Sequence, residues 1–240
     1  MSWAVIFGAS GDIGQMIARQ LADAGWSLTM HYYQNEQVIT TLTDELRKNY
    51  PKQDFLPLQF DMTTSDVEAV TSQLFAVDAL IFAEGTTSYH LFNEAPMADL
   101  DKMMKMQVQT PLALIQKLEP KLALNHFGRI IFIGSIYGGV GSPMEVLYST
   151  VKGALSAFSN AYSKEVASLG ITVNVVAPGA VDTKMNQQFS EETKKLISNE
   201  IPIGRFAHPE EIGFWVKQLL AKEAGYLTGQ TIYVSGGWLK

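Results

Sequence analysis

The chain has 240 residues, of which 47% are hydrophobic, and its 18 basic and 24 acidic residues give a formal net charge of −6. This acidic balance argues against a nucleic-acid-binding protein, which must neutralise many phosphates. Cysteine is absent, which excludes disulfides and thiolate metal sites, and the four histidines lie far apart in the sequence, so we expect no catalytic metal.

The hydrophobic pattern predicts a protein that works away from membranes. No apolar run approaches the roughly eighteen residues of a membrane span, and Met1 is followed by a strand-like segment instead of a basic leader. We therefore expect a soluble, cytoplasmic protein with no membrane or nucleic-acid partner. A chain of this length and composition can bury one large core, so we expect a single domain over residues 1–240.

Short apolar runs alternate with longer segments of helical periodicity along the chain. The predicted strands are 3–7, 27–31, 54–60, 78–83, 129–134, 171–176 and 231–234. The predicted helices are 12–24, 35–49, 64–75, 99–124, 148–169 and 209–222. This alternation predicts an α/β fold of the Rossmann type, with a doubly wound, parallel, seven-stranded sheet. Pro111 predicts a kink or a break in the helix at 99–124, and the strand-free segment near 184–207 is expected to be a substrate lid.

A glycine turn follows the first predicted strand, in the stretch FGASGDIGQ at residues 7–15. Gly8, Gly11 and Gly14 fall three residues apart, between a strand and a helix. The spacing alone also fits a tight turn without a ligand. The position at the start of a helix favours a dinucleotide, because the helix N-terminus offers free N–H groups and a positive dipole end to a pyrophosphate.

A second pattern concerns Ser135, Tyr148 and Lys152. Of nine tyrosines, only Tyr148 has a lysine four residues later, which places the two side chains on one helix face, with Cβ atoms about 5–6 Å apart. Ser135 ends a predicted strand at the carboxyl edge of the sheet, where such folds bind ligands. A half-buried tyrosine, a solvated lysine and a turn serine are the alternative interpretation. No GxSxG motif surrounds Ser135, which disfavours a serine hydrolase.

These residue types suit the reduction of a carbonyl group. Hydride delivery to a carbonyl carbon builds negative charge on the oxygen, so a positioned acid must supply a proton. An ammonium about 4 Å away, at an effective dielectric of about 20, contributes roughly 4 kcal/mol, enough to lower the pKa of a phenol by about three units. We therefore expect Lys152 to make Tyr148 acidic.

The glycine turn and these three residues resemble the short-chain dehydrogenase/reductase family, and the resemblance covers essentially the whole chain. The single-domain branch usually reads TGxxxGxG, whereas this chain has Phe7 in place of the threonine and Asp12 in place of the middle glycine. The glycine count fits the longer TGxxGxxG branch, but no residues are left to build its added substrate domain. We interpret Asp12 as a local swap whose side chain points away from the phosphates.

The resemblance implies a role for each site residue. Tyr148 would be the acid, Lys152 would also hold the nicotinamide ribose, and Ser135 would hydrogen-bond the substrate oxygen. The stretch ITVNVVAPGAVDTKM would border the nicotinamide, and Asp61 in LQFDM would lie beside the adenine. The implied cofactor-binding residues are Gly8, Ser10, Gly11, Asp12, Ile13, Gly14, His31, Asp61, Met62, Ala83, Gly85, Tyr148, Lys152, Pro178, Gly179, Val181 and Thr183.

The chain also departs from the family pattern. The family's NNAG is replaced by FAEG at residues 82–85, and Gln107 stands where the family has a catalytic asparagine. We count Gln107 among the catalytic residues, with its link to Lys152 through water displaced by the extra methylene. The end of the second strand, HYYQNE, contains His31 and no acid at the strand end, which favours NADPH over NADH although no arginine marks the phosphate.

The C-terminal stretches IPIGRFAHPEEI and YLTGQTIYVSGGW resemble bacterial 3-oxoacyl-[acyl-carrier-protein] reductases. This resemblance predicts NADPH-dependent reduction of a ketone, on a small molecule or a carrier protein, in fatty acid biosynthesis, by a homotetramer. However, His126 and Leu169 stand where such enzymes often have basic docking residues. Other basic residues that could form a docking patch are Lys102, Lys105, Lys121 and Arg129.

Two alternatives remain open. HYYQNE and EVLYSTVKGA resemble the elongation factor P 5-aminopentanone reductases, a function that would explain the missing basic residues. The altered FAEG and Gln107 also fit an inactive dinucleotide-binding regulator, although the intact Ser135, Tyr148 and Lys152 speak against it.

Overall fold

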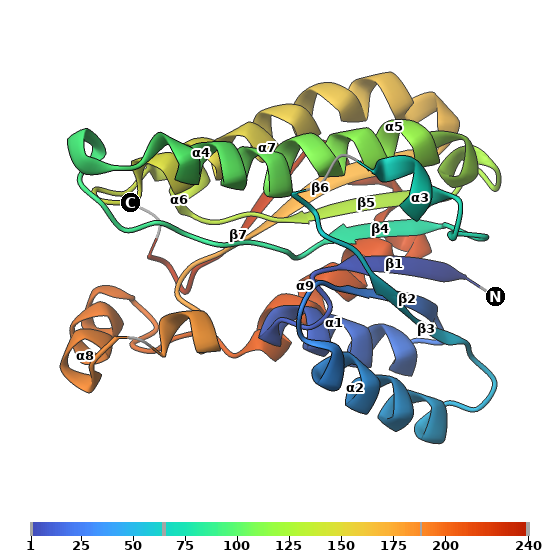
Figure 1. The fold of residues 1–240 in the computed structure, drawn as a ribbon, viewed down its shortest axis with the longest axis horizontal. Coiled ribbons are helices and arrows are strands. Elements are labelled where there is room, and N and C mark those ends of the chain that lie inside the picture. The colour runs from blue at the N-terminus through green and yellow to red at the C-terminus, as the bar shows by residue number, and fades with distance from the viewer. Residues whose placement is uncertain (1, 64–65, 188, 239–240) are drawn as a thin grey trace.

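The computed structural model describes residues 2–63, 66–187 and 189–238, and these form a parallel sheet with helices on both faces (Figure 1). The sheet has seven strands in the order β3-β2-β1-β4-β5-β6-β7, and every neighbouring pair is parallel. The strands are β1 (Trp3–Phe7), β2 (Ser27–Tyr32), β3 (Phe55–Gln59), β4 (Ala79–Phe82), β5 (Gly128–Ile133), β6 (Ile171–Pro178) and β7 (Thr231–Val234). The predicted Rossmann-type fold in a single domain is therefore confirmed.

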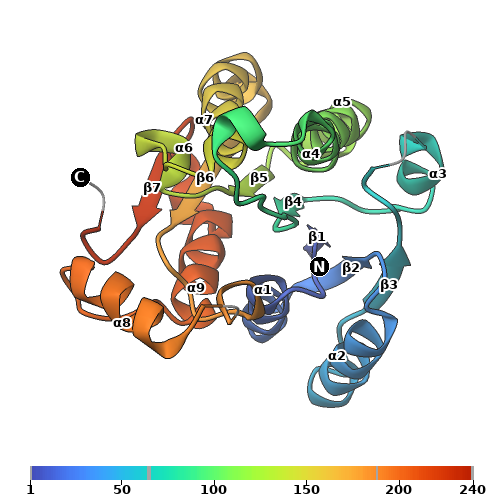
Figure 2. The same ribbon diagram turned by 60° about the vertical axis from the view of Figure 1, so that its left-hand side comes forward.

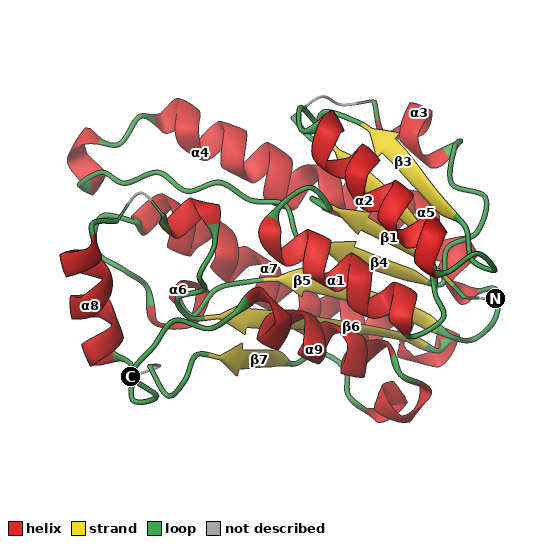
Figure 3. Cartoon of the chain, turned by 90° about the horizontal axis from the view of Figure 1, so that it is seen from below, coloured by secondary structure: helices red, strands yellow, loops and turns green. Residues whose placement is uncertain are grey.

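Two helical layers cover the sheet because alternate residues of each strand point to opposite faces. On one face, Ala4 and Ile6 pack against α1 (Asp12–Asp23), α2 (Glu36–Asn49) and α9 (Pro209–Leu220). On the other, Val5 and Phe7 share a core with α5 (Thr110–Ala123) and α7 (Val146–Val166). Figure 2 shows the two helical layers on opposite sides of the sheet. Figure 3, seen from below, shows α1, α2 and α9 in front of the strands.

The strand order reverses between β1 and β4, and this fixes where a ligand can bind. The chain runs outward from β1 through β2 to β3, and then returns to place β4 on the other side of β1. The loops after β1 and β4 therefore diverge at the carboxyl edge of the sheet, which leaves the crevice that open α/β folds use for ligands.

The segment predicted as one helix at 99–124 is divided in the structure. It consists of α4 (Met97–Met104), a π-helical turn (Lys105–Gln109) and α5. Pro111 is the second residue of α5 and cannot donate a backbone hydrogen bond to the preceding turn, which is the π-helical one; the backbone stays helical across this junction. The expected division is thus present, but it takes the form of a wider turn directly before the proline.

The segment 184–207 contains a helix that the periodicity does not predict. It holds a short 3₁₀ turn (Lys184–Asn186) and α8 (Glu191–Glu200), while residue 188 lies outside the described residues. The Oγ of Ser190 caps α8 by accepting a hydrogen bond from the N–H of Thr193. None of the residues of α8 is fully buried, so the helix has no strong apolar stripe for a sequence pattern to reveal.

Smaller elements complete the described chain. The helix predicted at 64–75 is shorter, with α3 at Val67–Thr71, and residues 64–65 lie outside the described residues. A one-turn helix, α6 (Tyr137–Val140), follows β5, and 3₁₀ turns occur at Phe92–Glu94, Ala167–Leu169 and Lys222–Tyr226. In the described part of the chain, no helix is both long and apolar enough to span a membrane.

Candidate active site

The glycine turn between β1 and α1 is shaped by close backbone contacts. Gly8 has φ +75°, and a Cβ at this position would lie 2.5 Å from the backbone nitrogen of Glu84. A Cβ on Gly14 would lie 2.2 Å from the carbonyl oxygen of Gly8. Gly11 is less crowded and stands at the N-terminus of α1 without a side-chain cap. The turn therefore fits a pyrophosphate, because it leaves free N–H groups beside an open groove.

The side chain of Asp12 is hydrogen-bonded to the segment after β6. Its Oδ2 accepts a hydrogen bond from the backbone N–H of Lys184, with an N···O distance of 2.6 Å. The aspartate therefore joins the start of α1 to the start of the segment that follows β6.

His31 lines the groove, but its ring braces the turn. Its Nδ1 accepts a hydrogen bond from the N–H of Gly8 at 3.0 Å, and its Nε2 lies 2.8 Å from the carbonyl oxygen of Phe60, to which it donates. Burial lowers the pKa of His31 to about 4, so the ring is neutral at neutral pH. His31 is thus suited to holding Gly8 in place and carries no charge for a phosphate.

Two adjoining cavities hold almost all of the predicted site residues. The larger, about 790 Å³, follows the glycine turn, and the smaller, about 190 Å³, lies over the ends of β5 and β6. Both cavities are lined by Ile13, Ala83, Glu84, Gly85, Thr183 and Met185, so they are continuous. The larger cavity also includes Gly8, Ser10, Gly11, Asp12, Gly14, His31, Asp61 and Met62. The smaller includes Ser135, Tyr148, Lys152, Pro178, Gly179 and Val181.

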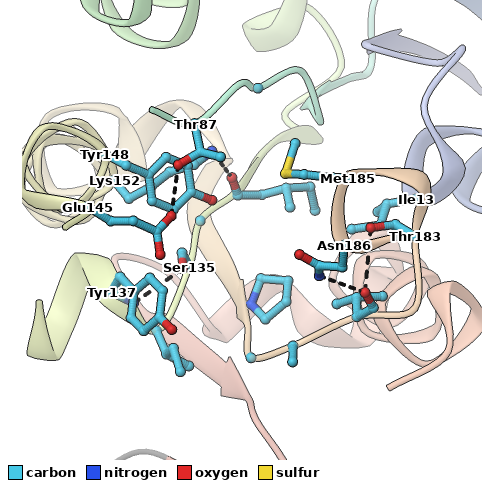
Figure 4. A pocket seen from close by; sticks show the side chains of 18 of the residues that line it. Ile13, Thr87, Ser135, Tyr137, Glu145, Tyr148, Lys152, Thr183, Met185 and Asn186 are labelled. Atoms are coloured by element: carbon cyan, nitrogen blue, oxygen red, sulfur yellow. Dashed lines mark hydrogen bonds between the residues drawn. The ribbon is translucent and has the colours of Figure 1, made fainter. Parts of the chain in front are cut away.

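Ser135, Tyr148 and Lys152 come together at one wall of the smaller cavity (Figure 4). The hydroxyl of Ser135 hydrogen-bonds that of Tyr148, and the Lys152 Nζ lies 5.5 Å from the centre of the Tyr148 ring. The Nζ of Lys152 donates to the carbonyl oxygen of Ile133 at 2.9 Å. Met185 and Asn186, from the segment after β6, face them across the cavity (Figure 4).

The expectation that Lys152 lowers the pKa of Tyr148 is wrong for this structure. Burial raises the pKa of the phenol, and the negative charge of Glu145 raises it further, whereas the Ser135 hydrogen bond lowers it in part. The sequence argument included the charge of the lysine and omitted the cost of burying a phenolate. Tyr148 is therefore fully protonated at neutral pH, which is the form that can donate a proton.

Gln107 lies behind the two cavities, in the π-helical turn, and is 1% exposed. Its Nε2 donates to the carbonyl oxygen of Thr86 at 3.1 Å, while its Oε1 has no hydrogen-bond partner among the described residues. A Cβ on Gly85 would lie 3.0 Å from this oxygen and 3.6 Å from the Lys152 Nζ. Gln107 thus presents an unpaired acceptor near Lys152 and makes no direct hydrogen bond to it.

Glu84 is a site residue that the sequence reasoning did not single out. It follows β4 directly, lines both cavities, and its Oε2 is buried without a hydrogen-bond partner in the described part of the chain. Burial raises the pKa of Glu84, and the charge of Lys152 opposes this shift. Burial likewise lowers the pKa of Lys152, and the charge of Glu84 opposes that shift. The carboxylate in IFAEG, at the end of an apolar strand, is the signal that could have identified it.

Glu145 is the second missed residue. It stands one helical turn before Tyr148, is 7% exposed, and lines the smaller cavity. Its Oε1 accepts a hydrogen bond from the Thr87 hydroxyl at 2.7 Å, and its carboxylate also accepts one from Tyr89. Burial raises the pKa of Glu145 and these two hydrogen bonds lower it. Its spacing of three residues from Tyr148 was visible in the sequence.

The departures at Phe7 and Phe82 belong to one packing arrangement. The two residues are register partners in β1 and β4, and their rings stack with centroids 5.0 Å apart. Phe132, the β5 partner of Phe82, extends the stack at 5.0 Å. An aromatic row therefore fills the space beneath the glycine turn, where the family pattern has a threonine and an asparagine.

The end of β2 bears on the choice of dinucleotide. Residues 31–35 (HYYQN) line the groove and include no carboxylate. The nearby Asp61 is engaged, since its Oδ1 accepts hydrogen bonds from the N–H and hydroxyl of Thr63 at 2.8 and 2.7 Å. Tyr33 also hydrogen-bonds Asp61, and the charge of Lys102 helps to lower the pKa of this aspartate.

Lys102 and Arg129, both considered for a docking patch, lie at opposite edges of the sheet. Lys102 lines the larger cavity, whereas Arg129 is the second residue of β5. Arg129 is buried, with its guanidinium 4.1 Å from the Phe127 ring centre and bonded to the carbonyl oxygen of Gly128. Lys121 donates to the carbonyl oxygen of Leu74. Separately, the described residues contain no group of three or more metal-ligating side chains.

Comparison with known proteins agrees with this geometry. A family model described as enoyl-(acyl carrier protein) reductase, from the short-chain dehydrogenase/reductase family, matches residues 8–239. The chain is 39% identical over 237 residues to an uncharacterized oxidoreductase, YmfI, of Bacillus subtilis, covering 98% of each chain. It is 34% identical over 236 residues to the 3-oxoacyl-[acyl-carrier-protein] reductase FabG of Rickettsia bellii, covering 98% of this chain and 96% of that one.

A solved structure shows the same fold. YwfH, described as an NADPH-dependent reductase involved in bacilysin biosynthesis, superposes with a TM-score of 0.93 at 26% identity, covering 100% of this chain and 98% of that one. The matches span the glycine turn, the Ser135, Tyr148 and Lys152 cluster and the C-terminal strand. The chain is an oxidoreductase that belongs to the short-chain dehydrogenase/reductase family.

Proposed function

We propose that this protein reduces a ketone to a secondary alcohol with NADPH. The observation that supports this most strongly is the grouping of Ser135, Tyr148 and Lys152 at the point where the dinucleotide groove opens into a second cavity. A substrate carbonyl in that cavity would lie between the hydroxyl groups of Ser135 and Tyr148, which already hydrogen-bond each other.

The glycine turn and the other residues of the larger cavity would hold NADPH, which would supply the hydride that the carbonyl carbon accepts. The Ser135 hydroxyl donates a hydrogen bond to the carbonyl oxygen and holds it in place. Tyr148 gives its phenolic proton to the same oxygen, which completes the alcohol and leaves a phenolate. The ammonium of Lys152, beside the Tyr148 ring, stabilises that phenolate until a solvent proton replaces the one transferred.

The choice of NADPH rests on the end of β2. An acidic residue there would hold the ribose hydroxyls of NADH and repel the extra phosphate of NADPH. Tyr33, Gln34 and Asn35 supply uncharged hydrogen-bonding groups instead. The similarity to YwfH, an NADPH-dependent reductase by its description, supports the same choice.

The test measures the oxidation of NADPH and of NADH by the change in absorbance, in the presence of each ketone of a panel. The proposal predicts turnover of at least one ketone, with a higher kcat/KM for NADPH than for NADH. A higher kcat/KM for NADH would overturn the cofactor choice, and binding of both dinucleotides without turnover of any ketone would favour the inactive regulator.

For the substrate, our first candidate is a 3-oxoacyl group carried by an acyl carrier protein, as in fatty acid synthesis. Similarity to the Rickettsia bellii enzyme over nearly the whole chain supports it. The second candidate is the 5-aminopentanone group of a modified elongation factor P. A specific observation favours the second: Arg129 is buried and Lys121 is hydrogen-bonded to the backbone, so neither is free to dock an acidic carrier.

An acetoacetyl thioester and the modified elongation factor would separate the two candidates. Turnover of the thioester alone would support the first, and turnover of the elongation factor alone would support the second. A homotetrameric assembly and a cytoplasmic location remain predictions from the family resemblance, and the mass of the purified protein in solution tests the first of them.

A further inference from the structure

The smaller cavity contains a carboxylate that the proposed reduction does not use. Glu145 lies beside the proposed acid, because residues 145 and 148 are one helical turn apart on α7. Neither Ser135 nor Lys152 is among the groups that bind it. A carboxylate that is 7% exposed needs a compensating partner, since burying an unpaired charge is costly.

Capping of α7 does not account for Glu145. The residue occupies the N-cap position, where a carboxylate usually accepts hydrogen bonds from the first free N–H groups. Its side chain makes no such bond and turns into the cavity, where it meets the hydroxyl groups of Thr87 and Tyr89. Figure 4 shows the carboxylate pointing toward the space beside Ser135 and Tyr137.

Nor does a cation of the chain neutralise it. The described residues that line the cavity include one basic side chain, Lys152, seven residues along the helix from Glu145. That ammonium is engaged with the carbonyl oxygen of Ile133 and faces Glu84. The other carboxylate close to this end of the cavity is Glu200 of α8, which adds further negative charge near Tyr137.

Two tyrosines lie next to Glu145: Tyr89 hydrogen-bonds its carboxylate, and Tyr137 is close enough to be affected by its charge. Tyr89, Tyr137 and Trp238 all line the cavity, and the rings of Tyr137 and Trp238 pack edge to face at 6.1 Å. Aromatic faces beside a carboxylate are a common environment for alkylammonium groups, because ring faces attract cations and exclude water. Thus the carboxylate and the rings point independently to the same ligand chemistry.

We propose that Glu145 binds a protonated amine of the substrate, so that the ketone reduced at this site carries an ammonium group. This inference rests on the reductase function proposed above and narrows its substrate class. The ammonium would sit between the Glu145 carboxylate and the neighbouring aromatic rings while the carbonyl meets Ser135 and Tyr148.

The same pairing would assist proton transfer. The negative charge of Glu145 disfavours the phenolate that Tyr148 becomes after it donates its proton. A substrate cation beside Glu145 cancels that charge and removes the penalty. A neutral ketone leaves the penalty in place, so the site selects for cationic ketones in the chemical step as well as in binding.

The experiment compares two probes of the same shape. One is a methyl ketone with a dimethylammonium group three methylenes from the carbonyl, and the other has a CH in place of the ammonium N–H. In the wild-type protein, kcat/KM should be higher for the cationic ketone. Glu145→Gln should lower kcat/KM for the cationic ketone by roughly tenfold to a hundredfold, while kcat/KM for the neutral ketone stays equal or rises.

Glu200→Gln is the matched control, because it removes an exposed carboxylate near the same end of the cavity, and it should leave the preference unchanged. Glu145→Asp should keep part of the preference. If Glu145 merely ties the loop at Thr87 to α7, Glu145→Gln will lower both activities by the same factor, and the proposal is wrong.

A binding measurement separates this inference from the proposed function. Butyldimethylammonium has no ketone, and calorimetry should show that it binds the wild-type protein in the presence of NADP⁺ and binds Glu145→Gln at least tenfold more weakly. If neither ketone is reduced but butyldimethylammonium binds Glu145→Gln more weakly than the wild type, the ammonium site is supported and the proposed reductase function is refuted. If the ketones are reduced but the ammonium binds both proteins equally, the ammonium site is refuted.

Discussion

Removing the Glu84 carboxylate should shift the pH dependence of the reaction in a defined direction. In the proposed mechanism, Lys152 acts as an ammonium, and burial lowers its pKa while the charge of Glu84 keeps that pKa from falling further. Glu84→Gln preserves the shape of the side chain and removes the charge. The pKa of Lys152 should therefore fall, and activity should be lost at a lower pH than in the wild type.

The magnitude follows from the protonation of one group. Loss of a charge interaction worth about 1.4 kcal/mol would lower the pKa of Lys152 by about one unit and move the alkaline limb of the pH profile down by the same amount. We expect kcat/KM for a neutral ketone to fall about fivefold at the midpoint of the wild-type limb and hardly at all about two pH units below it.

The assay is the pH profile of NADPH oxidation from pH 6 to 9, with Glu200→Gln as the control and thermal unfolding as the check on folding. An alkaline limb that stays in place, or moves to higher pH, would show that the Glu84 charge does not hold the Lys152 proton. A uniform loss of activity at every pH would indicate a structural role instead.

Four further predictions concern the glycine turn, the start of α1 and the proposed acid. Tyr148→Phe should lower kcat by about 10²- to 10⁴-fold with little change in NADPH affinity, measured by fluorescence titration, and full activity would remove Tyr148 from its role. Gly14→Ala should destabilise the fold by about 1–3 kcal/mol or more in thermal unfolding, because its Cβ would meet the Gly8 oxygen at 2.2 Å. Gly11→Ala should fold normally, because its nearest contact is 3.4 Å, and bind NADPH more weakly; equal stability losses for both glycines would contradict this view of the turn. Asp12→Ala should speed hydrogen exchange at the Lys184 N–H several-fold, because a charge-assisted bond of 2.6 Å is lost, and unchanged exchange would show that the bond does not form in solution.

The fold was predictable from periodicity because the strands are buried on both faces. The run at β6 is buried throughout and mostly apolar, so its position stands out, and the strand ends differ from the prediction by at most two residues. The helix α8 shows the limit of this signal. None of its ten residues is fully buried and most of them are polar or charged, so the segment did not stand out as a helix in the sequence.

The site was predictable where one element fixes the spacing. Tyr148 and Lys152 share α7, and the glycines share one turn, so their geometry follows from local structure. The place of Glu145 in the site depends on its hydrogen bond with Thr87, which lies 58 residues away in the sequence. Spacing along α7 alone therefore does not reveal it. The pKa of Tyr148 was mispredicted for the same reason, because burial is a tertiary property that spacing along a helix does not contain.

Departures from the family pattern became interpretable once the strands were paired. Phe7 and Phe82 are far apart in the sequence. Considered separately, each is a position where the chain has lost a polar residue of the family pattern. Their register in β1 and β4 makes them one change, because each ring supplies the other's stacking partner at 5.0 Å. The altered FAEG stretch is therefore compatible with an intact groove and is weak support for an inactive regulator.

The charges around the proposed acid bear on the choice between the two candidate substrates. The smaller cavity is lined by two carboxylates, Glu84 and Glu145, and one ammonium, Lys152. Because Glu84 and Lys152 offset each other, Glu145 carries the uncompensated charge next to Tyr148. An acyl thioester is neutral near its ketone and would leave that charge in place as the phenolate forms. The amino group of an aminopentanone would supply that cation. Under the proposal above, position 145, one helical turn from the acid, is therefore the residue that would distinguish a reductase of cationic ketones from a reductase of neutral ones.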